Sequence, residues 1–178
     1  ADAKKFAEKI GYPVIVRPSY VLSGSAMRVA HNETSLENFL KLAAKVSRDH
    51  PVVISKFINR AKEVEVDGVS DGENVLIGAI MEHVENAGVH SGDATMTIPP
   101  TSLMNHVTNT IEEYTTEIAR ALRICGPFNV QYLVKDGQVF VIECNLRASR
   151  SLPFVSKTIG INLVFIATAF MLGKKLRD

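Results

Sequence analysis

Four side chains suited to metal and phosphate chemistry follow an apolar stretch late in the chain. Glu143, Asn145 and Arg147 alternate, so on an extended backbone they share one face, and Arg150 follows three residues later. Mg²⁺ takes carboxylate and amide oxygens and keeps its other positions for water and phosphate oxygens, while arginine binds phosphate or carboxylate in a planar fork. The spacing predicts a metal-bridged phosphate site. A strand end with a solvated charged fringe is the alternative, and this segment alone does not decide between them.

The preceding strand supplies a further oxygen ligand. Residues 129–134 predict a strand, 135–137 a turn, and 138–142 the returning strand. A loop of odd length, with Gly137 at a positive φ, places Gln131 and Glu143 on the same face, whereas a two-residue loop places them on opposite faces. We expect the odd loop, and therefore an oxygen-rich cluster that also includes Asn145.

Two further segments suggest nucleotide contacts, each with an ordinary structural alternative. Residues 13–30 predict two strands joined by a loop of small residues, which could cover phosphates with backbone N–H groups or be a plain polar turn. Arg17 ends an apolar strand, where a charge is more often exposed than functional. Strict alternation places Glu63, Glu65 and Asp67 on one face of a strand, which we interpret as solvated.

The polar stretch 82–93 contains two glycines and two histidines. His83 and His90 have no Cys partner or HExxH spacing, which argues against a zinc site. His90 beside Ser91 suits a phosphate or substrate contact, and a histidine in an ordinary turn is equally compatible.

Composition places the chain among ordinary globular proteins. It has 178 residues, 46% apolar and 22% charged, with a formal net charge of +1. That charge gives no argument for a nucleic-acid or membrane partner, and no apolar run is long enough to span a bilayer. Cys125 and Cys144 show no metal-binding pattern and suggest a reducing compartment. Both ends resemble cuts in a longer polypeptide.

The order of predicted elements is a strand hairpin, a helix, several antiparallel strands, a long helix over 102–122, a hairpin and short closing helices. This order predicts an α+β fold rather than a βαβαβ nucleotide fold.

Four segments in this order resemble an ATP-grasp domain, and more narrowly that of the carbamoyl phosphate synthetase large chain: residues 17–24, 85–93, 126–131 and 142–150. The resemblance covers nearly the whole chain. Residues 89–92 and 153–157 resemble the second, C-terminal copy in that family, which phosphorylates carbamate. Ser23 and residues 144–146 resemble the eukaryotic fused form.

The resemblance implies two subdomains, with mainly antiparallel sheets, that clamp ATP. Residues 1–57 would form the smaller lid, N-terminally incomplete, and residues 58–178 the larger base with the metal and substrate site. The activity implied is phosphorylation of carbamate by ATP to give carbamoyl phosphate. Because family members have further sequence upstream, we expect the 178-residue chain alone to bind Mg-ATP weakly and to be nearly inactive.

The resemblance also assigns nucleotide contacts. Arg17 would hold phosphates, Lys56 and Ile58 would line the adenine pocket, and Glu63 would accept hydrogen bonds from the ribose hydroxyls. The loop beside ribose and phosphates would contain Gly88, Val89, His90 and Ser91.

The metal and substrate contacts follow in the same way. Gln131, Glu143 and Asn145 would ligate two Mg²⁺ or Mn²⁺ ions, with Glu143 bridging them. Arg147 and Arg150, together with Asn145, would form the catalytic group that holds carbamate and its phosphorylated product.

Partners implied by the family are the other domains of the large chain and a glutamine amidotransferase domain or subunit, in the cytoplasm or the mitochondrial matrix. Two alternatives stay open. Another ATP-grasp ligase, such as a biotin carboxylase-like or peptide ligase, would share Glu143 and Asn145 but lack the 89–93 loop. A non-catalytic nucleotide-sensing module is disfavoured by the intact ligand set.

Overall fold

The computed structural model describes residues 2–19, 27–46, 51–89 and 93–177. The chain divides into two compact units, Ala1–Asn59 and Arg60–Asp178. The lid and base roles inferred from the sequence for the two parts of the chain stay predictions.

The first unit is a three-stranded antiparallel sheet with two helices. Its elements are α1 (Asp2–Ile10), β1 (Val14–Pro18), β2 (Arg28–Ala30), α2 (Glu33–Val46) and β3 (Val52–Lys56), with strand order β2-β1-β3. Asn32 caps α2: its Oδ1 accepts the N–H of Ser35 at 2.9 Å, while Ser35 Oγ accepts the N–H of Asn32 at 3.2 Å. A small core that includes Val14, Val16 and Leu36 joins the sheet to the helices.

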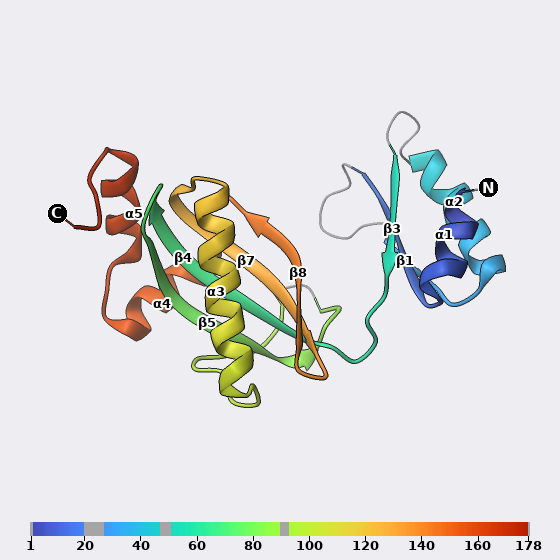
Figure 1. The fold of residues 1–178 in the computed structure, drawn as a ribbon, viewed down its shortest axis with the longest axis horizontal. Helices are drawn as coiled ribbons and strands as arrows, with labels where there is room; N and C mark the ends of the chain where they lie inside the picture. The colour runs from blue at the N-terminus through green and yellow to red at the C-terminus, as the bar shows by residue number, and fades with distance from the viewer. Residues whose placement is uncertain (1, 20–26, 47–50, 90–92, 178) are drawn as a thin grey trace. The chain divides into compact units, whose positions relative to one another are not determined.

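The second unit is a five-stranded antiparallel sheet with helices on both faces (Figure 1). Its strand order is β6-β5-β4-β7-β8. The strands are β4 (Lys62–Asp71), β5 (Val75–Asn86), β6 (Met96–Thr97), β7 (Cys125–Lys135) and β8 (Gln138–Asn145). The helices are α3 (Asn105–Ala121), α4 (Leu152–Ile159) and α5 (Leu163–Met171). The α+β prediction, with its long helix before the last hairpin, is confirmed.

Alternation along β4 divides the unit into two hydrophobic cores. Val64 and Val66 pack with Ile111 of α3 on one face. Val69, on the other face, packs with Val155 of α4 and Leu163 of α5. Because the side-chain period of a strand is two, Glu63, Glu65 and Asp67 share the face of α4 and α5. One end of that face is therefore apolar and covered by helices, and the rest is polar.

Within the described part of the chain, no single helix has the length and apolar character needed to cross a membrane, whereas α4 and α5, bent by 115°, reach that threshold together.

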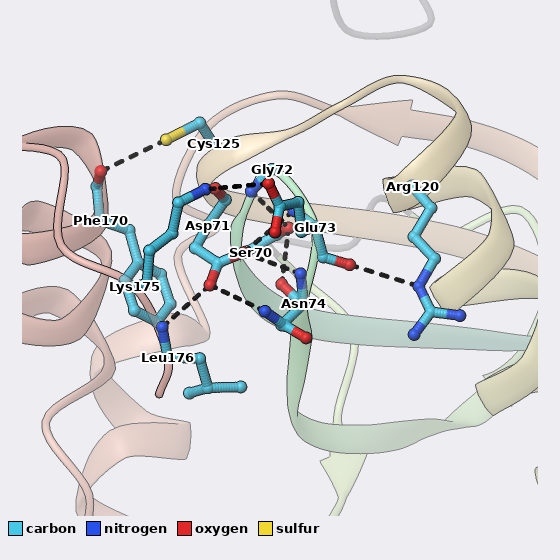
Figure 2. A network of polar contacts seen from close by, with 10 residues as sticks. All are labelled: Ser70, Asp71, Gly72, Glu73, Asn74, Arg120, Cys125, Phe170, Lys175 and Leu176. Carbon is cyan, nitrogen blue, oxygen red and sulfur yellow. Dashed lines mark hydrogen bonds and ion pairs between the residues drawn. The ribbon is translucent and has the colours of Figure 1, made fainter. Parts of the chain in front are cut away.

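A network of hydrogen bonds at the β4–β5 turn joins the C-terminal residues to the sheet (Figure 2). Asp71 Oδ1 accepts the N–H groups of Glu73 and Asn74 at 2.9 and 2.7 Å, and Oδ2 accepts the N–H of Leu176 at 2.9 Å. Lys175 Nζ donates to the Asp71 carbonyl at 3.0 Å. Burial alone raises the pKa of Asp71, but the N–H donors of Asn74, Leu176 and Glu73 outweigh it and hold this pKa well below 3.8.

We therefore expect Asp71→Ala to lower the free energy of unfolding at neutral pH by about 2 kcal/mol, since hydrogen bonds to a charged group contribute roughly 1.5–3 kcal/mol. A depressed folded-state pKa stabilises the fold above the unfolded-state value and loses that effect as the pH falls through the folded-state value. The gap between wild type and variant should thus narrow below pH 3.8. Urea midpoints across pH measure it, with Glu113→Ala on the exposed side of α3 as control. A gap independent of pH would contradict the assignment.

Candidate functional site

The turn between β7 and β8 has two residues rather than an odd number. Lys135 pairs with Gln138, which leaves Asp136 and Gly137 between them. Their φ values are 51° and 77°. Positive φ at both central positions is the signature of a type I′ hairpin turn. The predicted odd loop is therefore wrong.

A β-bulge in the same hairpin reverses the consequence of that turn. Near the turn Tyr132 pairs with Val141, but the register then shifts, and Gln131 pairs with Glu143. The extra residue, Ile142, changes which side chains of β8 lie on each face of the sheet. Gln131 and Glu143 therefore lie opposite each other on one face, as expected, but because of the bulge and not because of the loop length.

Polar residues form two rows across three strands on this face. The rows are Glu65–Gln131–Glu143 and Asp67–Asn129–Asn145, read from β4 through β7 to β8. Directly paired residues of antiparallel strands have Cβ atoms roughly 4.5–5.5 Å apart, so each row is continuous.

The outer end of the rows is open to ligands. Glu143 lies on the edge strand β8 and is exposed, while Gln131 and Asn145 are half-buried. Asn145 Nδ2 donates to Glu143 Oε1 at 2.9 Å, so the side-chain carbonyl oxygen of Asn145 takes no part in that bond. This set contains only oxygen ligands, which suits a hard cation such as Mg²⁺. The predicted gathering of the three residues is confirmed, and metal binding stays a prediction.

The acidic face of β4 is buried, so our interpretation of a solvated face is wrong. Glu63, Glu65 and Asp67 are 7%, 3% and 0% exposed. His83 Nε2 lies 3.1 Å from Glu65 Oε1, and the ligand atoms of Glu63, Glu65 and His83 all lie within 4.8 Å of one another. Asn129 Nδ2 donates to both Glu65 Oε2 and Asp67 Oδ1 at 3.0 Å. Polar partners across the sheet replace the solvent that we expected.

Glu63 lies where carboxylates are crowded. Burial raises its pKa, and His83 and the Gly88 N–H oppose this rise, while Glu65 and Glu143 add to it. Gly88, with φ 119°, is exposed, and so is Val89. Glu63 and Gly88 thus lie together, as the proposed ribose contacts require. His90 and Ser91 lie outside the described residues.

Both arginines follow β8 and are exposed. Arg147 Nη1 donates to the neighbouring Ala148 carbonyl at 3.2 Å, and neither arginine forms an ion pair among the residues that the structure describes. Arg147 also lines a surface pocket of about 360 Å³ together with Arg123 and Cys125. Two arginines that follow Asn145 closely in the chain, and that have no carboxylate partner within the described residues, are suited to an anionic substrate.

Three predicted nucleotide contacts belong to the first unit. Arg17 is exposed near the end of β1, and Ile58 is half-buried. Lys56 Nζ donates to the carbonyls of Gly11 and Tyr12 at 2.9 and 3.0 Å, which holds its side chain against the loop between α1 and β1. Their roles toward a nucleotide stay predictions.

Sequence reasoning missed several residues of this face. Asn129 alternates with Gln131, and that period of two was a usable signal. His83 lies two residues after the buried Met81 and shares its strand face, but only the contact between His83 Nε2 and Glu65 Oε1 shows which residue it faces. Ser151 donates to Asp67 Oδ2 at 2.6 Å across a separation of 84 residues, and no local pattern shows such a contact.

The whole chain matches a known protein family. The family described as "Carbamoyl-phosphate synthase L chain, ATP binding domain" matches residues 1–178. The chain is 55% identical over 177 residues to the carbamoyl phosphate synthase large chain, C-terminal section, of Methanocaldococcus jannaschii. It is 51% identical over 175 residues to the multifunctional protein URA2 of Saccharomyces cerevisiae, and 54% identical over 177 residues to the mitochondrial carbamoyl-phosphate synthase [ammonia] of Aquarana catesbeiana. These matches cover 99%, 98% and 99% of this chain but 29%, 8% and 12% of the relatives.

Solved structures show the same fold. A biotin carboxylase from Campylobacter jejuni, in complex with β,γ-ATP, is similar with a TM-score of 0.87 and 24% identity over 99% of this chain and 40% of that one. Rhizobium etli pyruvate carboxylase is similar with a TM-score of 0.82 and 24% identity, over 97% and 16% of the two chains. The ATP-grasp fold expected from the sequence is confirmed.

Proposed function

We propose, from the premise that this chain belongs to the carbamoyl-phosphate synthase L chain ATP-binding family, that it binds Mg-ATP and phosphorylates carbamate to carbamoyl phosphate. The observation that carries the proposal is the open end of the polar rows, formed by Gln131, Glu143 and Asn145. Two arginines follow these residues in the chain and form no ion pair with any residue that the structure describes. Oxygen ligands beside guanidinium groups suit a metal-bound phosphate next to a small anion.

Metal ions fit this ligand set. Gln131, Glu143 and Asn145 would hold two Mg²⁺ or Mn²⁺ ions. When bound, the ions neutralise the charge on the phosphate oxygens during transfer.

The chain's own residues would bind and orient the reactants. Glu63 would accept hydrogen bonds from the ribose hydroxyls beside Gly88, and the first unit would contribute Arg17, Lys56 and Ile58. Arg147 and Arg150 would hold carbamate so that its oxygen faces the γ-phosphorus in line. The new P–O bond forms as the bond to the β-phosphate oxygen breaks, which gives carbamoyl phosphate and ADP. Carbamate is already anionic, so no general base is needed.

The wider setting is also proposed. The chain spans less than a third of the curated relatives cited above. We infer that it works with the remaining domains of a large chain and with a glutamine amidotransferase domain or subunit. We place it in the cytoplasm, with the mitochondrial matrix as the alternative because one relative is mitochondrial.

A different ATP-grasp ligase is the second candidate, because the fold is shared with biotin carboxylase. The two are distinguished by ATP formation from ADP and carbamoyl phosphate, assayed in a large chain that carries this domain. We expect ATP formation that requires Mg²⁺, is lost in Glu143→Ala and persists in Glu113→Ala. Absence of ATP formation by the wild type would overturn the proposed function.

A further inference from the structure

A buried chain of hydrogen bonds crosses the sheet and ends at the segment that carries the arginines. Glu65 and Asp67 of β4 both accept from Asn129 Nδ2 at 3.0 Å, and Asp67 Oδ2 also accepts from Ser151 Oγ at 2.6 Å. Ser151 Oγ lies 3.0 Å from Ser149 Oγ. The three sheet residues are at most 3% exposed.

Asp67 is an unusual acceptor at this point. It is fully buried, and its partners in the described structure are neutral: the Asn129 amide and the hydroxyls of Ser149 and Ser151. A carboxylate is costly to bury without a cation, so packing alone does not explain an acid here. Its two oxygens do, however, allow it to accept from the sheet and from the loop at the same time.

The two serines fix the backbone on either side of Arg150. Ser149 Oγ accepts the N–H of Leu152 at 3.0 Å, and the Ser151 carbonyl accepts the N–H of Val155 at 2.8 Å. Arg150 lies between them and is exposed. Its side chain therefore starts from a backbone position that Asp67 holds against the sheet.

We propose that Asp67, through Ser151, is a positioning residue that places Arg150 beside the open end of the polar rows, where it would hold carbamate. This inference rests on the proposed function. Asp67 and Ser151 touch no reacting atom, and their effect comes through the direction of Arg150. A catalytic group displaced by about 1 Å can lower the rate about 10²-fold, whereas ATP contacts elsewhere on the sheet stay in place.

The test uses a large chain that carries this domain, with carbamoyl phosphate formation and Mg-ADP affinity measured separately. We expect Ser151→Ala to lower kcat about 10-fold or more while the Kd for Mg-ADP changes less than about 3-fold. Ser151→Thr, which keeps the hydroxyl, should restore most of the loss. Thr158→Ala, which removes a hydroxyl bonded within α4, is the matched control and should leave kcat unchanged.

Asp67→Ala removes the same hydrogen bond by changing the acceptor instead of the donor. The double variant should be no slower than the slower single variant, because both changes remove one interaction. If urea titration shows that Asp67→Ala does not fold, the kcat values of Ser151→Ala and Ser151→Thr decide the test alone. Normal kcat in Ser151→Ala would overturn the inference, as would an equal loss of Mg-ADP affinity, which indicates general disruption. A wild type without activity would instead count against the proposed function.

Discussion

Glu143→Ala should lower the rate of carbamoyl phosphate formation by at least about 10²-fold, the loss typical of removing one electrostatic stabiliser. Glu143 stands at the open end of its row, opposite Gln131 and within hydrogen-bonding distance of Asn145. In the proposed site it is one of the residues that would hold the metal, so its loss would leave phosphate charge uncompensated in the transition state. The measurement is kcat in a large chain that carries this domain, over a range of Mg²⁺ concentrations.

Two controls separate this effect from loss of the fold. Glu113→Ala removes an exposed carboxylate from α3 and should leave kcat within about 2-fold, since surface changes rarely alter the free energy of unfolding by more than about 0.5 kcal/mol. Glu143 is itself exposed, so its removal should barely move the urea midpoint. Near-normal turnover of Glu143→Ala would remove the basis for the metal assignment.

Arg147→Ala and Glu63→Ala should affect different kinetic constants. Arg147 is free of carboxylate partners in the described structure and would meet charge that redistributes during transfer, so its loss should lower kcat by roughly 10²-fold. Glu63 would contact ribose, where little changes between ground and transition states. Its loss should raise the KM for ATP about 10-fold with kcat nearly unchanged.

Steady-state kinetics with ATP as the varied substrate measure both constants. Arg120→Ala is the matched control for Arg147→Ala. Arg120 Nε donates to the Glu73 carbonyl at the β4–β5 turn, and Arg120 has no role in the proposed site. Equal losses of kcat in Arg147→Ala and Glu63→Ala, with KM unchanged, would contradict this division of roles.

The outer part of the site was predictable because local spacing determines it. Glu143 and Asn145 share a strand, and Gln131 lies one short hairpin away, so the grouping of the three proposed ligands depends on a single turn and its register. Even there, the correct conclusion rested on an incorrect loop length. Gly137 fits either loop, and no residue type announces the bulge at Ile142.

The inner part could not be read in the same way. Alternation in β4 shows that Glu63, Glu65 and Asp67 share a face, but the same pattern describes a solvated face and a buried one. What decides is the partner across the sheet: Asn129 and His83 come from other strands, and Ser151 comes from beyond the hairpin. Such contacts depend on tertiary structure, which a single sequence does not specify.

The bulge at Ile142 determines which side chains of β8 share a face with Gln131. The two-residue turn at Asp136–Gly137 puts Glu143 on the wrong side of the sheet, and one extra residue in the ladder puts it back. Pairing that continued from Tyr132 and Val141 without the bulge would set Ile142 opposite Gln131 and turn Glu143 to the other face, whereas deletion of Ile142 would let Glu143 follow Val141 directly and keep its place opposite Gln131. The hairpin therefore needs the register and not the extra residue, so a bulge-free hairpin one residue shorter would present Gln131 and Glu143 in the same way.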